Sequence, residues 1–284
     1  MIFNCDVGLN YHMALDPDAP IYRFLKFEDL IDLFANNRLY FRRVDLWADP
    51  WENVARKMVF DVNENQVASG FCAAGTKTAG EFYASCWTSQ FDTDAMWRIY
   101  SGNSEAVCIK TTLRKFFCST VPFTDIRMDA FVGPVKYIEG RIEESRLKSL
   151  YNQMYDEYPD YMIPIFLKRD AFQHEHEIRM AARYLDVNLE NGQPAHKLTT
   201  DKKGLFWSLQ DTEFLEQIIL PPQIGERKEQ YYREVISKYN DNLEVRRSDL
   251  YASPAGMKEP ENLDRNHGLP RTAKHWDWEL KEEI

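Results

Sequence analysis

The sequence lacks several features that would place it in a familiar functional class. It contains no G-x-G-x-x-G and no P-loop pattern, so two common nucleotide-binding devices are absent. No two of its five cysteines have C-x-x-C spacing, which argues against a zinc knuckle. No stretch approaches the roughly 18 apolar residues of a membrane span, and the start, MIFNCDVGLNYHMALD, has no basic region followed by a long apolar run. We therefore expect a soluble, cytoplasmic protein.

Positive charge is also scarce relative to negative charge. The chain has 35 Lys and Arg against 45 Asp and Glu, a formal net charge of −10. Such a net charge argues against a general polyanion binder but does not exclude a local basic groove. Of its 284 residues, 44% are hydrophobic, which is enough for one sizeable core.

Strand and helix patterns mix along the chain without regular alternation, which favours an α+β fold over a doubly wound sheet. We expect a single α+β domain over residues 1–251. From residue 252 the chain is polar and contains proline, so 252–284 is expected to dock on the body or to be partly disordered. The expected strands are Ile21–Leu25, Leu39–Val44, Lys57–Val62, Phe82–Thr88, Ala106–Lys110, Val135–Ile138, Glu175–Ala182 and Leu243–Leu250, with a further apolar run at Phe214–Leu220. The expected helices are 27–34, Asp94–Tyr100, Leu113–Phe117, Glu143–Tyr155 and Glu226–Tyr239.

The segment AFQHEHEIRM carries the most concentrated chemistry in the sequence. If it is a strand, Glu175, Glu177 and Arg179 share one face, and His174 and His176 share the other. Two carboxylates about 7 Å apart on one face repel each other unless a cation lies nearby. Three interpretations stay open: a solvent-facing strand neutralised by Arg179 and a neighbouring base, a metal pair formed by the two histidines, or a catalytic pair of carboxylates.

The catalytic interpretation suits a reaction that develops positive charge on a sugar. One carboxylate would steady an oxocarbenium-like centre and hold a ribose hydroxyl, and the other would orient or deprotonate the incoming nucleophile. Such a site also needs a cation for phosphates and a strand that packs against the leaving base. Arg23, next to Tyr22, offers the cation, and Ser85, Trp87 and Thr88 offer hydroxyls beside a large ring. A structural ion pair for Arg23 and a core position for Trp87 are the alternatives.

Four stretches, in this order and spacing, carry a family resemblance. They are LYFRRVDLWADPWE, SCWTSQFDTDAMWRIYSG, VKY and KRDAFQHEHEIR. Together they resemble the uncharacterised bacterial domain-of-unknown-function family 2971 over about residues 22–220. In the loop of the first stretch, Asp49 and Glu52 flank Pro50, which is typical of a capped turn and could also line a cleft. Ala48 and Trp51 depart from the family pattern there.

A second resemblance implies a function. The order of Arg23, a Ser/Thr strand and Glu175-x-Glu177 is similar to the layout of ADP-ribosyltransferases. That resemblance implies a split, mixed β-sheet with flanking helices that clamps NAD and transfers ADP-ribose to a protein or nucleic acid. It also implies that Arg23, beside Tyr22, holds the NAD phosphate or ribose. The resemblance implies that Ser85 and Thr88, around Trp87, shape the nicotinamide pocket, with residues 87–89 as an alternative alignment of this motif. It also implies that Glu177 binds the ribose 2′-hydroxyl and that Glu175 serves the acceptor.

The leading hypothesis is an NAD-dependent ADP-ribosyltransferase-like protein with an unknown acceptor. The resemblance makes a bacterial toxin or a phage-defence effector a plausible setting. One rival hypothesis is a non-enzymatic interaction module, which gains if Arg23 and Glu177 lie on opposite surfaces. The other is a metal-dependent hydrolase or nuclease that uses His174 and His176.

Overall fold

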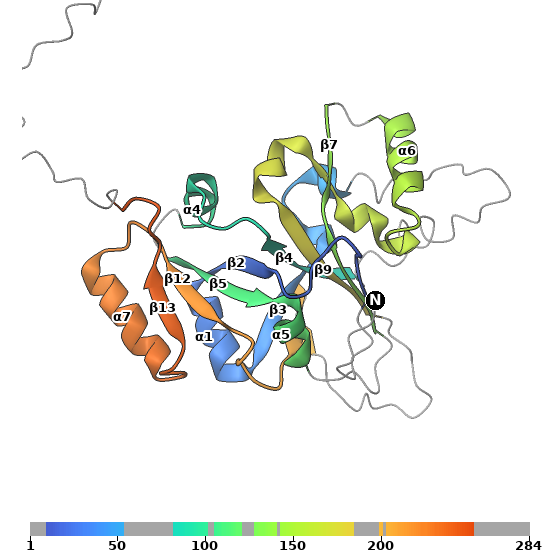
Figure 1. Cartoon of the computed structure of the whole chain (residues 1–284). Helices are drawn as coiled ribbons and strands as arrows, with labels where there is room; N and C mark the ends of the chain where they lie inside the picture. The colour runs from blue at the N-terminus through green and yellow to red at the C-terminus, as the bar shows by residue number, and fades with distance from the viewer. Residues whose placement is uncertain are drawn as a thin grey trace, which may run out of the picture. The chain divides into compact units, whose positions relative to one another are not determined.

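The computed structural model describes residues 10–53, 82–101, 105–120, 128–140, 143–184, 199–200 and 203–252, and Figure 1 shows their arrangement. The strands are β1 Asn10–Tyr11, β2 Pro20–Lys26, β3 Arg38–Arg43, β4 Phe82–Thr88, β5 Ala106–Thr112, β6 Met128–Pro134, β7 Lys136–Ile138, β8 Leu167–Arg169, β9 Glu177–Tyr184, β10 Thr199–Thr200, β11 Gly204–Ser208, β12 Gln217–Leu220 and β13 Glu244–Arg247. The α-helices are α1 Phe27–Asn36, α4 Asp94–Tyr100, α5 Leu113–Cys118, α6 Glu144–Met154 and α7 Glu226–Ser237. The 3-10 helices are η1 Val44–Leu46, η2 Pro50–Asn53, η4 Asp160–Phe166 and η5 Asp170–Glu175.

Most of these strands form one mixed sheet. Its main path runs β1-β6-β9-β4-β2-β5-β12-β13, and β3 joins β4 to β11, which pairs with β10. The β1–β6 and β12–β13 pairs are parallel, and the other pairs of this sheet are antiparallel. The predicted α+β class, with a mixed sheet and flanking helices, is confirmed.

The sheet splits beside β4. One edge of β4 pairs with β9 along its whole length, from Phe82 to Thr88. On the other edge, β2 pairs only at Thr88, whereas β3 pairs at Ala84 and Tyr83. No described strand pairs with residues 85–87 on that edge, so β2 and β3 diverge there. This gap in the sheet positions the site described below.

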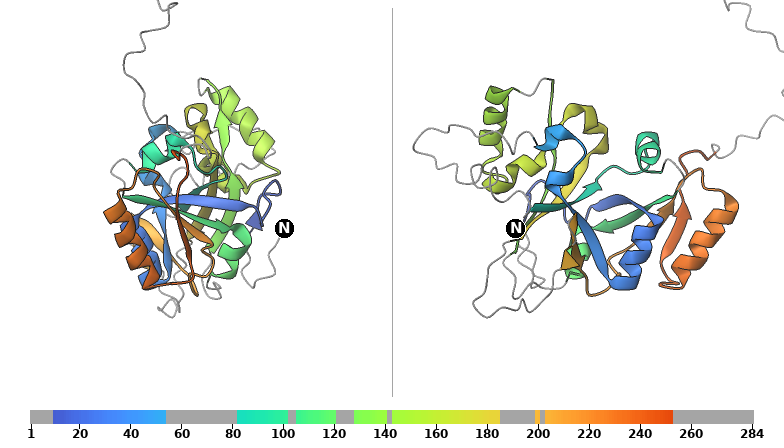
Figure 2. Two further views of the ribbon diagram at one scale, coloured as in Figure 1. Left: turned by 60° about the vertical axis from the view of Figure 1, so that its left-hand side comes forward. Right: turned by 180° about the vertical axis from the view of Figure 1, so that it is seen from behind.

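Helices cover the sheet in separate groups (Figure 2). The core beneath α1, α5 and α7 includes Leu33, Phe116 and Ile236, all at most 1% exposed. Helices α1 and α7 lie side by side, and the rings of Phe27 and Tyr232 stack 3.6 Å apart. A second cluster packs α6 and η4 against β4, β6 and β9, and a third packs α4 against β2, β5 and β12.

Local sequence explains the ends of the helices next to the gap. Helix α1 buries Leu30, Leu33 and Phe34, which recur at helical spacing, and it ends at Asn37, whose φ of 46° is left-handed. Helix α4 begins after Thr93, whose hydroxyl accepts a hydrogen bond from the Met96 main-chain N–H.

The predicted strand Lys57–Val62 and all but the first residue of the 252–284 extension lie outside the described residues. All described elements belong to the unit Met1–Tyr251, and a second unit is Ala252–Ile284, so the domain assignment stays a prediction. None of the described helices has the length and apolar character that crossing a membrane requires.

Candidate functional site

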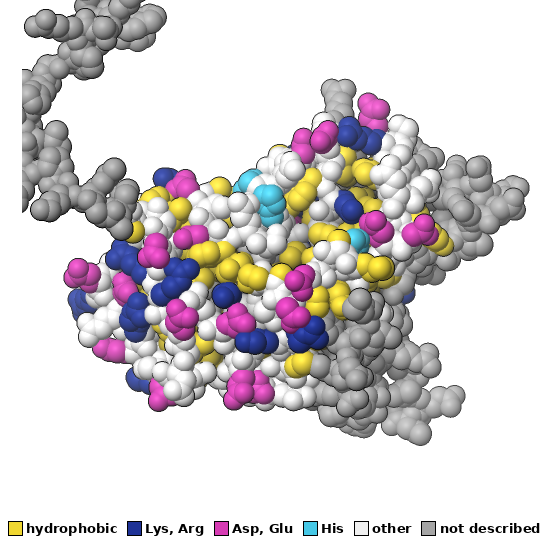
Figure 3. All heavy atoms as spheres, viewed as in Figure 1, with side chains coloured by type: hydrophobic (Ala, Val, Ile, Leu, Met, Phe, Trp, Pro, Cys, Tyr) yellow, Lys and Arg dark blue, Asp and Glu magenta, His cyan; other side chains and the backbone are white. Residues whose placement is uncertain are grey.

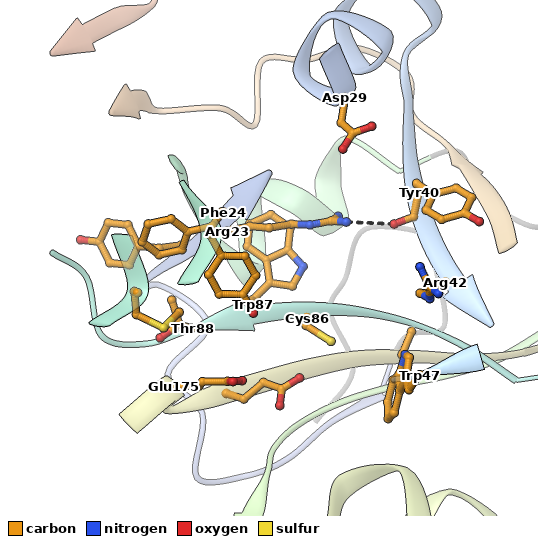
Figure 4. A pocket seen from close by; sticks show the side chains of 15 residues that line it. Arg23, Phe24, Asp29, Tyr40, Arg42, Trp47, Cys86, Trp87, Thr88 and Glu175 are labelled. Atoms are coloured by element: carbon orange, nitrogen blue, oxygen red, sulfur yellow. Dashed lines mark hydrogen bonds between the residues drawn. The ribbon is translucent and has the colours of Figure 1, made fainter. Parts of the chain in front are cut away.

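A cavity of about 420 Å³ opens where β2 and β3 diverge from β4. Figure 4 shows that side chains from β2, β3, β4, η5 and α1 converge on it. We call it the main cavity. Its lining residues are Tyr22, Arg23, Phe24, Asp29, Tyr40, Arg42, Trp47, Ala84, Cys86, Trp87, Thr88, Met96, Tyr100, Glu175 and Glu177.

Two acidic side chains form one wall of the main cavity. Glu175 ends η5 and Glu177 begins β9, and His176 between them has a left-handed φ of 40°. The prediction of one strand from Glu175 is therefore wrong, because the chain turns at His176 before the sheet begins. The two carboxylates still meet at Lys168 Nζ, which donates to Glu175 Oε2 at 2.6 Å and to Glu177 Oε2 at 3.0 Å.

A second cation and a third acid complete a buried group. Arg179 donates from Nε to Glu177 Oε1 and from Nη2 to Glu177 Oε2, both at 2.8 Å. Its Nη2 also donates to Glu52 Oε1 at 2.7 Å, and the Trp47 ring lies 4.2 Å from its guanidinium carbon. Because these ions are removed from water, each must find opposite charge within the group. We call the group the acid cluster, and its members are Glu52, Lys168, Glu175, Glu177 and Arg179.

The acid cluster holds Glu177 ionised. Burial is the largest single influence and opposes ionisation, but the charges and hydrogen bonds of Arg179 and Lys168 together outweigh it and lower the pKa of Glu177 to about 2. Burial likewise works against the charge on Lys168, and the neighbouring carboxylates of Glu177 and Glu175 overcome it and raise the pKa of this amine. Burial, followed by the charge of Glu177, raises the pKa of the Cys86 thiol well above its usual range.

The two carboxylates differ in how many hydrogen bonds they already accept. An ionised carboxylate offers about four acceptor positions. Glu177 receives one bond from Lys168 and two from Arg179. Glu175 Oε2 receives the bond from Lys168, and its Oε1 has no partner among the described residues. Glu175 is therefore the acid that has a free oxygen beside the cavity.

The opposite wall carries a cation with few partners. Arg23 extends from β2, and its Nη2 donates to the main-chain carbonyl of Tyr40 at 3.1 Å (Figure 4). Its Nη1 is buried and has no hydrogen-bond partner within the described ranges. Burial is the main influence on its pKa, which is lowered. Arginine stays charged in proteins, and this half-buried guanidinium forms no salt bridge with an acid among the described residues, although the Asp29 carboxylate in the same cavity acts on it at longer range.

Aromatic side chains form a third wall. Tyr22 stacks on Phe91 at a centroid distance of 4.8 Å, and Phe24 stacks on Tyr100 at 5.5 Å. Tyr100 is 42% exposed, so part of its ring is available to a partner. This wall suits a flat heterocycle.

Six of the seven residues singled out in the sequence line the main cavity, namely Tyr22, Arg23, Trp87, Thr88, Glu175 and Glu177. The predicted role of Ser85 does not fit its position. Ser85 is fully buried and is not among the residues that line the cavity. Its hydroxyl accepts a hydrogen bond from Trp87 Nε1 at 2.9 Å, because alternation along β4 turns both side chains toward the core.

Trp87 and Thr88 line the main cavity, but their side chains are already engaged. The Trp87 ring is 2% exposed and contacts Phe116, with a centroid distance of 5.9 Å. The ring therefore takes the core position given as the alternative, and it lies beneath Arg23 (Figure 4), whose guanidinium carbon is 5.9 Å from the ring centroid. The Thr88 hydroxyl donates to the Gln90 carbonyl and accepts from the Gln90 N–H, which closes the turn after β4.

The histidines of the metal hypothesis lie outside this arrangement. His174 and His176 are exposed, and neither lines the main cavity. Across the described ranges, no three or more His, Cys, Asp or Glu side chains are grouped to hold a metal ion.

The sequence allowed two interpretations of the loop around Pro50, a capped turn and a cleft lined by Asp49 and Glu52. Both descriptions apply to that loop. Asp49 accepts a hydrogen bond from the Trp51 N–H at 3.0 Å and pairs with Arg169, whereas Glu52 reaches Arg179. Only the order of the motifs linked Glu52 with Arg179 in the sequence, because the two residues are 127 positions apart in the chain. Asp29 and Tyr40 were not singled out as cavity residues, because Asp29 lies outside the four family stretches and no role was tied to Tyr40 within the first of them.

Comparison with family models agrees with the first resemblance noted above. Residues 96–180 match the family described as Protein of unknown function (DUF2971). No curated protein matches the sequence. Among solved structures, Thermus sp. 2.9 DarT in complex with ADP-ribosylated ssDNA has a TM-score of 0.36 and 9% identity, and the match covers 84% of this chain and 99% of that chain. The same protein in complex with NAD+ has a TM-score of 0.37 and 8% identity over 84% and 100% of the two chains. Its complex with carba-NAD+ has a TM-score of 0.33 and 11% identity over 84% and 100%.

Proposed function

We propose that this protein is an NAD-dependent ADP-ribosyltransferase whose reaction takes place in the main cavity. The observation that carries the proposal is that Arg23 and both acids, Glu175 and Glu177, line one cavity. The condition under which the interaction-module hypothesis gains, Arg23 and Glu177 on opposite surfaces, is not met. The volume of about 420 Å³ lies in the range of small-molecule sites.

The chemistry of NAD cleavage matches the three walls. The bond between C1′ of the ribose and the nicotinamide nitrogen breaks, and nicotinamide leaves with the electron pair as a neutral molecule. Positive charge develops on the ribose, which a fixed carboxylate stabilises. The acceptor nucleophile then bonds to C1′ and gives up its proton. Arg23 would meet the diphosphate, and the aromatic wall of Tyr22, Phe24 and Tyr100 would pack against the nicotinamide.

The two carboxylates take different parts in this proposal. Glu177 is held ionised by Arg179 and Lys168, so it suits electrostatic stabilisation of the ribose cation rather than proton transfer. The hydrogen bonds from Lys168 and Arg179 fill three of the roughly four acceptor positions of this carboxylate, so one is left for a ribose 2′-hydroxyl. Glu175 has a free oxygen and would take the proton of the acceptor.

The acceptor, a protein or a nucleic acid, belongs to the same proposal. On the face in Figure 3, acidic and basic side chains are interspersed around a band of hydrophobic ones. The net charge of −10 does not favour a general nucleic-acid binder, so a nucleic-acid acceptor would be held locally near the cavity. A role as a toxin or in phage defence is the biological setting that this activity would serve.

The test is transfer of label from NAD carrying a radioactive adenylate phosphate. Purified protein is incubated with cell extract, with single-stranded DNA and with RNA, and nicotinamide release is measured in parallel. We expect release and labelling with the unaltered protein. Glu177→Gln should reduce both at least 100-fold, and Glu175→Gln should reduce labelling more than nicotinamide release. Absence of both nicotinamide release and labelling in the unaltered protein would reject the proposal.

A further inference from the structure

A second cavity, of about 360 Å³, adjoins the main cavity. Arg23, Asp29 and Tyr40 line both, so the two share a wall made by β2, α1 and β3. A ligand that contacts Arg23 from the main cavity can therefore continue past it. The second cavity is lined by Arg23, Leu25, Asp29, Asp32, Arg38, Leu39, Tyr40 and Phe206.

The far side of the second cavity is a flat, neutralised surface. The Arg38 guanidinium carbon lies 3.8 Å from the centre of the half-buried Phe206 ring, and the Tyr40 ring is 5.1 Å from the same centre. Arg38 also donates two hydrogen bonds to Asp32, at 2.8 and 2.6 Å. Because Asp32 neutralises Arg38 in this way, the surface suits a planar neutral heterocycle better than a phosphate.

Asp29 stands between the two cavities. Its carboxylate has no ion-pair partner in the part of the chain that the structure describes, and its side chain is exposed. A carboxylate in such a place accepts hydrogen bonds from hydroxyl groups and repels phosphate. The order along the shared wall is therefore a cation at Arg23, a hydroxyl acceptor at Asp29 and a flat surface at Phe206.

We propose that the second cavity binds the adenosine half of NAD and selects NAD over NADP. The diphosphate lies at Arg23, the ribose hydroxyls of the adenosine bond to Asp29, and the adenine packs on the surface formed by Arg38 and Phe206. A 2′-phosphate, as in NADP, would face the Asp29 carboxylate. This inference rests on the proposed function, since it assigns the other half of the same substrate.

The test measures dissociation constants by calorimetry for NAD, NADP, AMP and nicotinamide mononucleotide. Phe206→Leu keeps apolar bulk and removes the aromatic face. This substitution should weaken the binding of NAD and AMP about tenfold and change the affinity for nicotinamide mononucleotide by less than about twofold. Asp29→Asn should narrow the preference for NAD over NADP by about tenfold or more. Tyr155→Leu, at an exposed aromatic side chain outside both cavities, is the matched control.

Each outcome decides the matter. The assignment of the second cavity is overturned if Phe206→Leu weakens the binding of NAD and nicotinamide mononucleotide equally. It is also overturned if this variant binds NAD and AMP as tightly as the unaltered protein does. Asp29 is exposed, so its variant decides the question if Phe206→Leu does not fold. If the preference of Asp29→Asn for NAD over NADP equals that of the unaltered protein, this result contradicts the assignment independently. If the unaltered protein binds AMP through Phe206 but neither NAD nor nicotinamide mononucleotide, the proposed function fails and an adenosine site remains.

Discussion

The two walls of the main cavity treat buried charge in different ways. In the acid cluster, Glu177 is matched by Arg179 and Lys168, and its pKa falls to about 2. Across the cavity, Arg23 keeps a single hydrogen bond, to the Tyr40 carbonyl, and an unpartnered buried nitrogen among the described residues. The charges of the acid cluster are paired within the cluster, whereas Arg23 has no acid within salt-bridge distance among the described residues.

This difference separates structural from binding contributions. A closed set of ion pairs fixes the position of its carboxylates, so removing one member should mainly harm the fold and the geometry of the site. A desolvated cation without a partner costs stability, so removing it should leave the fold intact and remove affinity for an anionic ligand. The following experiments break or sharpen that contrast.

The largest effect is expected from Glu177→Gln. It leaves Arg179 and Lys168 without their shared negative charge, and breaking a buried pair in this way costs about 3–5 kcal/mol. Urea denaturation measures the loss in the free energy of unfolding. Glu28→Gln, whose exposed carboxylate pairs with Lys26 at the surface, should change it by less than about 0.5 kcal/mol. Equal effects of the two variants would mean that the acid cluster does not stabilise the fold.

The pH dependence of stability tests the same wall. Glu177 has a pKa of about 2 in the folded protein against an ordinary value of 4.5, so its ionisation stabilises the folded state above pH 4.5. That contribution, of about 3 kcal/mol, is lost as the pH falls from 4.5 toward 2. The difference in unfolding free energy between the unaltered protein and Glu177→Gln should therefore shrink over this window. A difference that stays constant with pH would contradict the depressed pKa.

Arg23→Met tests the open wall. Methionine fills much of the same space without a charge, so the free energy of unfolding should change by less than about 1 kcal/mol or increase. Affinity for NAD should fall about 10- to 100-fold, because charge-assisted hydrogen bonds to phosphate are lost. Denaturation and calorimetry on the same sample separate the two effects. A large loss of stability together with unchanged NAD affinity would reverse the roles of the walls.

The smallest effect is expected from Gly204→Ala on β11. A Cβ there would lie 2.3 Å from the Tyr40 ring and hydroxyl, so the ring must swing away. The ring is the end of a flexible side chain, and stability should fall by about 1 kcal/mol or less. Because Tyr40 borders both cavities, NAD affinity should fall several-fold. Gly225→Ala, where a Cβ would meet nothing within 4 Å, is the control, and identical NAD affinities in the two variants would contradict this position for Tyr40.

Local pattern predicted the elements around the site well. Strand β4 and helix α4 have the bounds expected from the sequence, Phe82–Thr88 and Asp94–Tyr100. Both depend on short-range features, an apolar run and the cap at Thr93. The turn at His176 was missed because a left-handed residue other than glycine leaves little trace in a sequence. Strands β6 and β11 were not expected either.

The composition of the site was harder to predict than its motifs. The motifs indicated Arg23, Glu175 and Glu177, which share the cavity. They could not show that Ser85 faces the core, because the faces of β4 depend on where neighbouring strands pair. They also could not show that Glu52 completes the acid cluster, since that contact joins residues 127 positions apart.

The central claim is that the main cavity holds NAD between the acid cluster and Arg23. A thermal-shift titration tests it most directly, because a ligand that binds only the folded state raises the melting temperature. We predict that NAD raises the melting temperature of the unaltered protein in a saturable manner and that Arg23→Met, at matched stability, loses most of this rise. If NAD leaves the melting temperature of the unaltered protein unchanged up to millimolar concentration, the claim is contradicted.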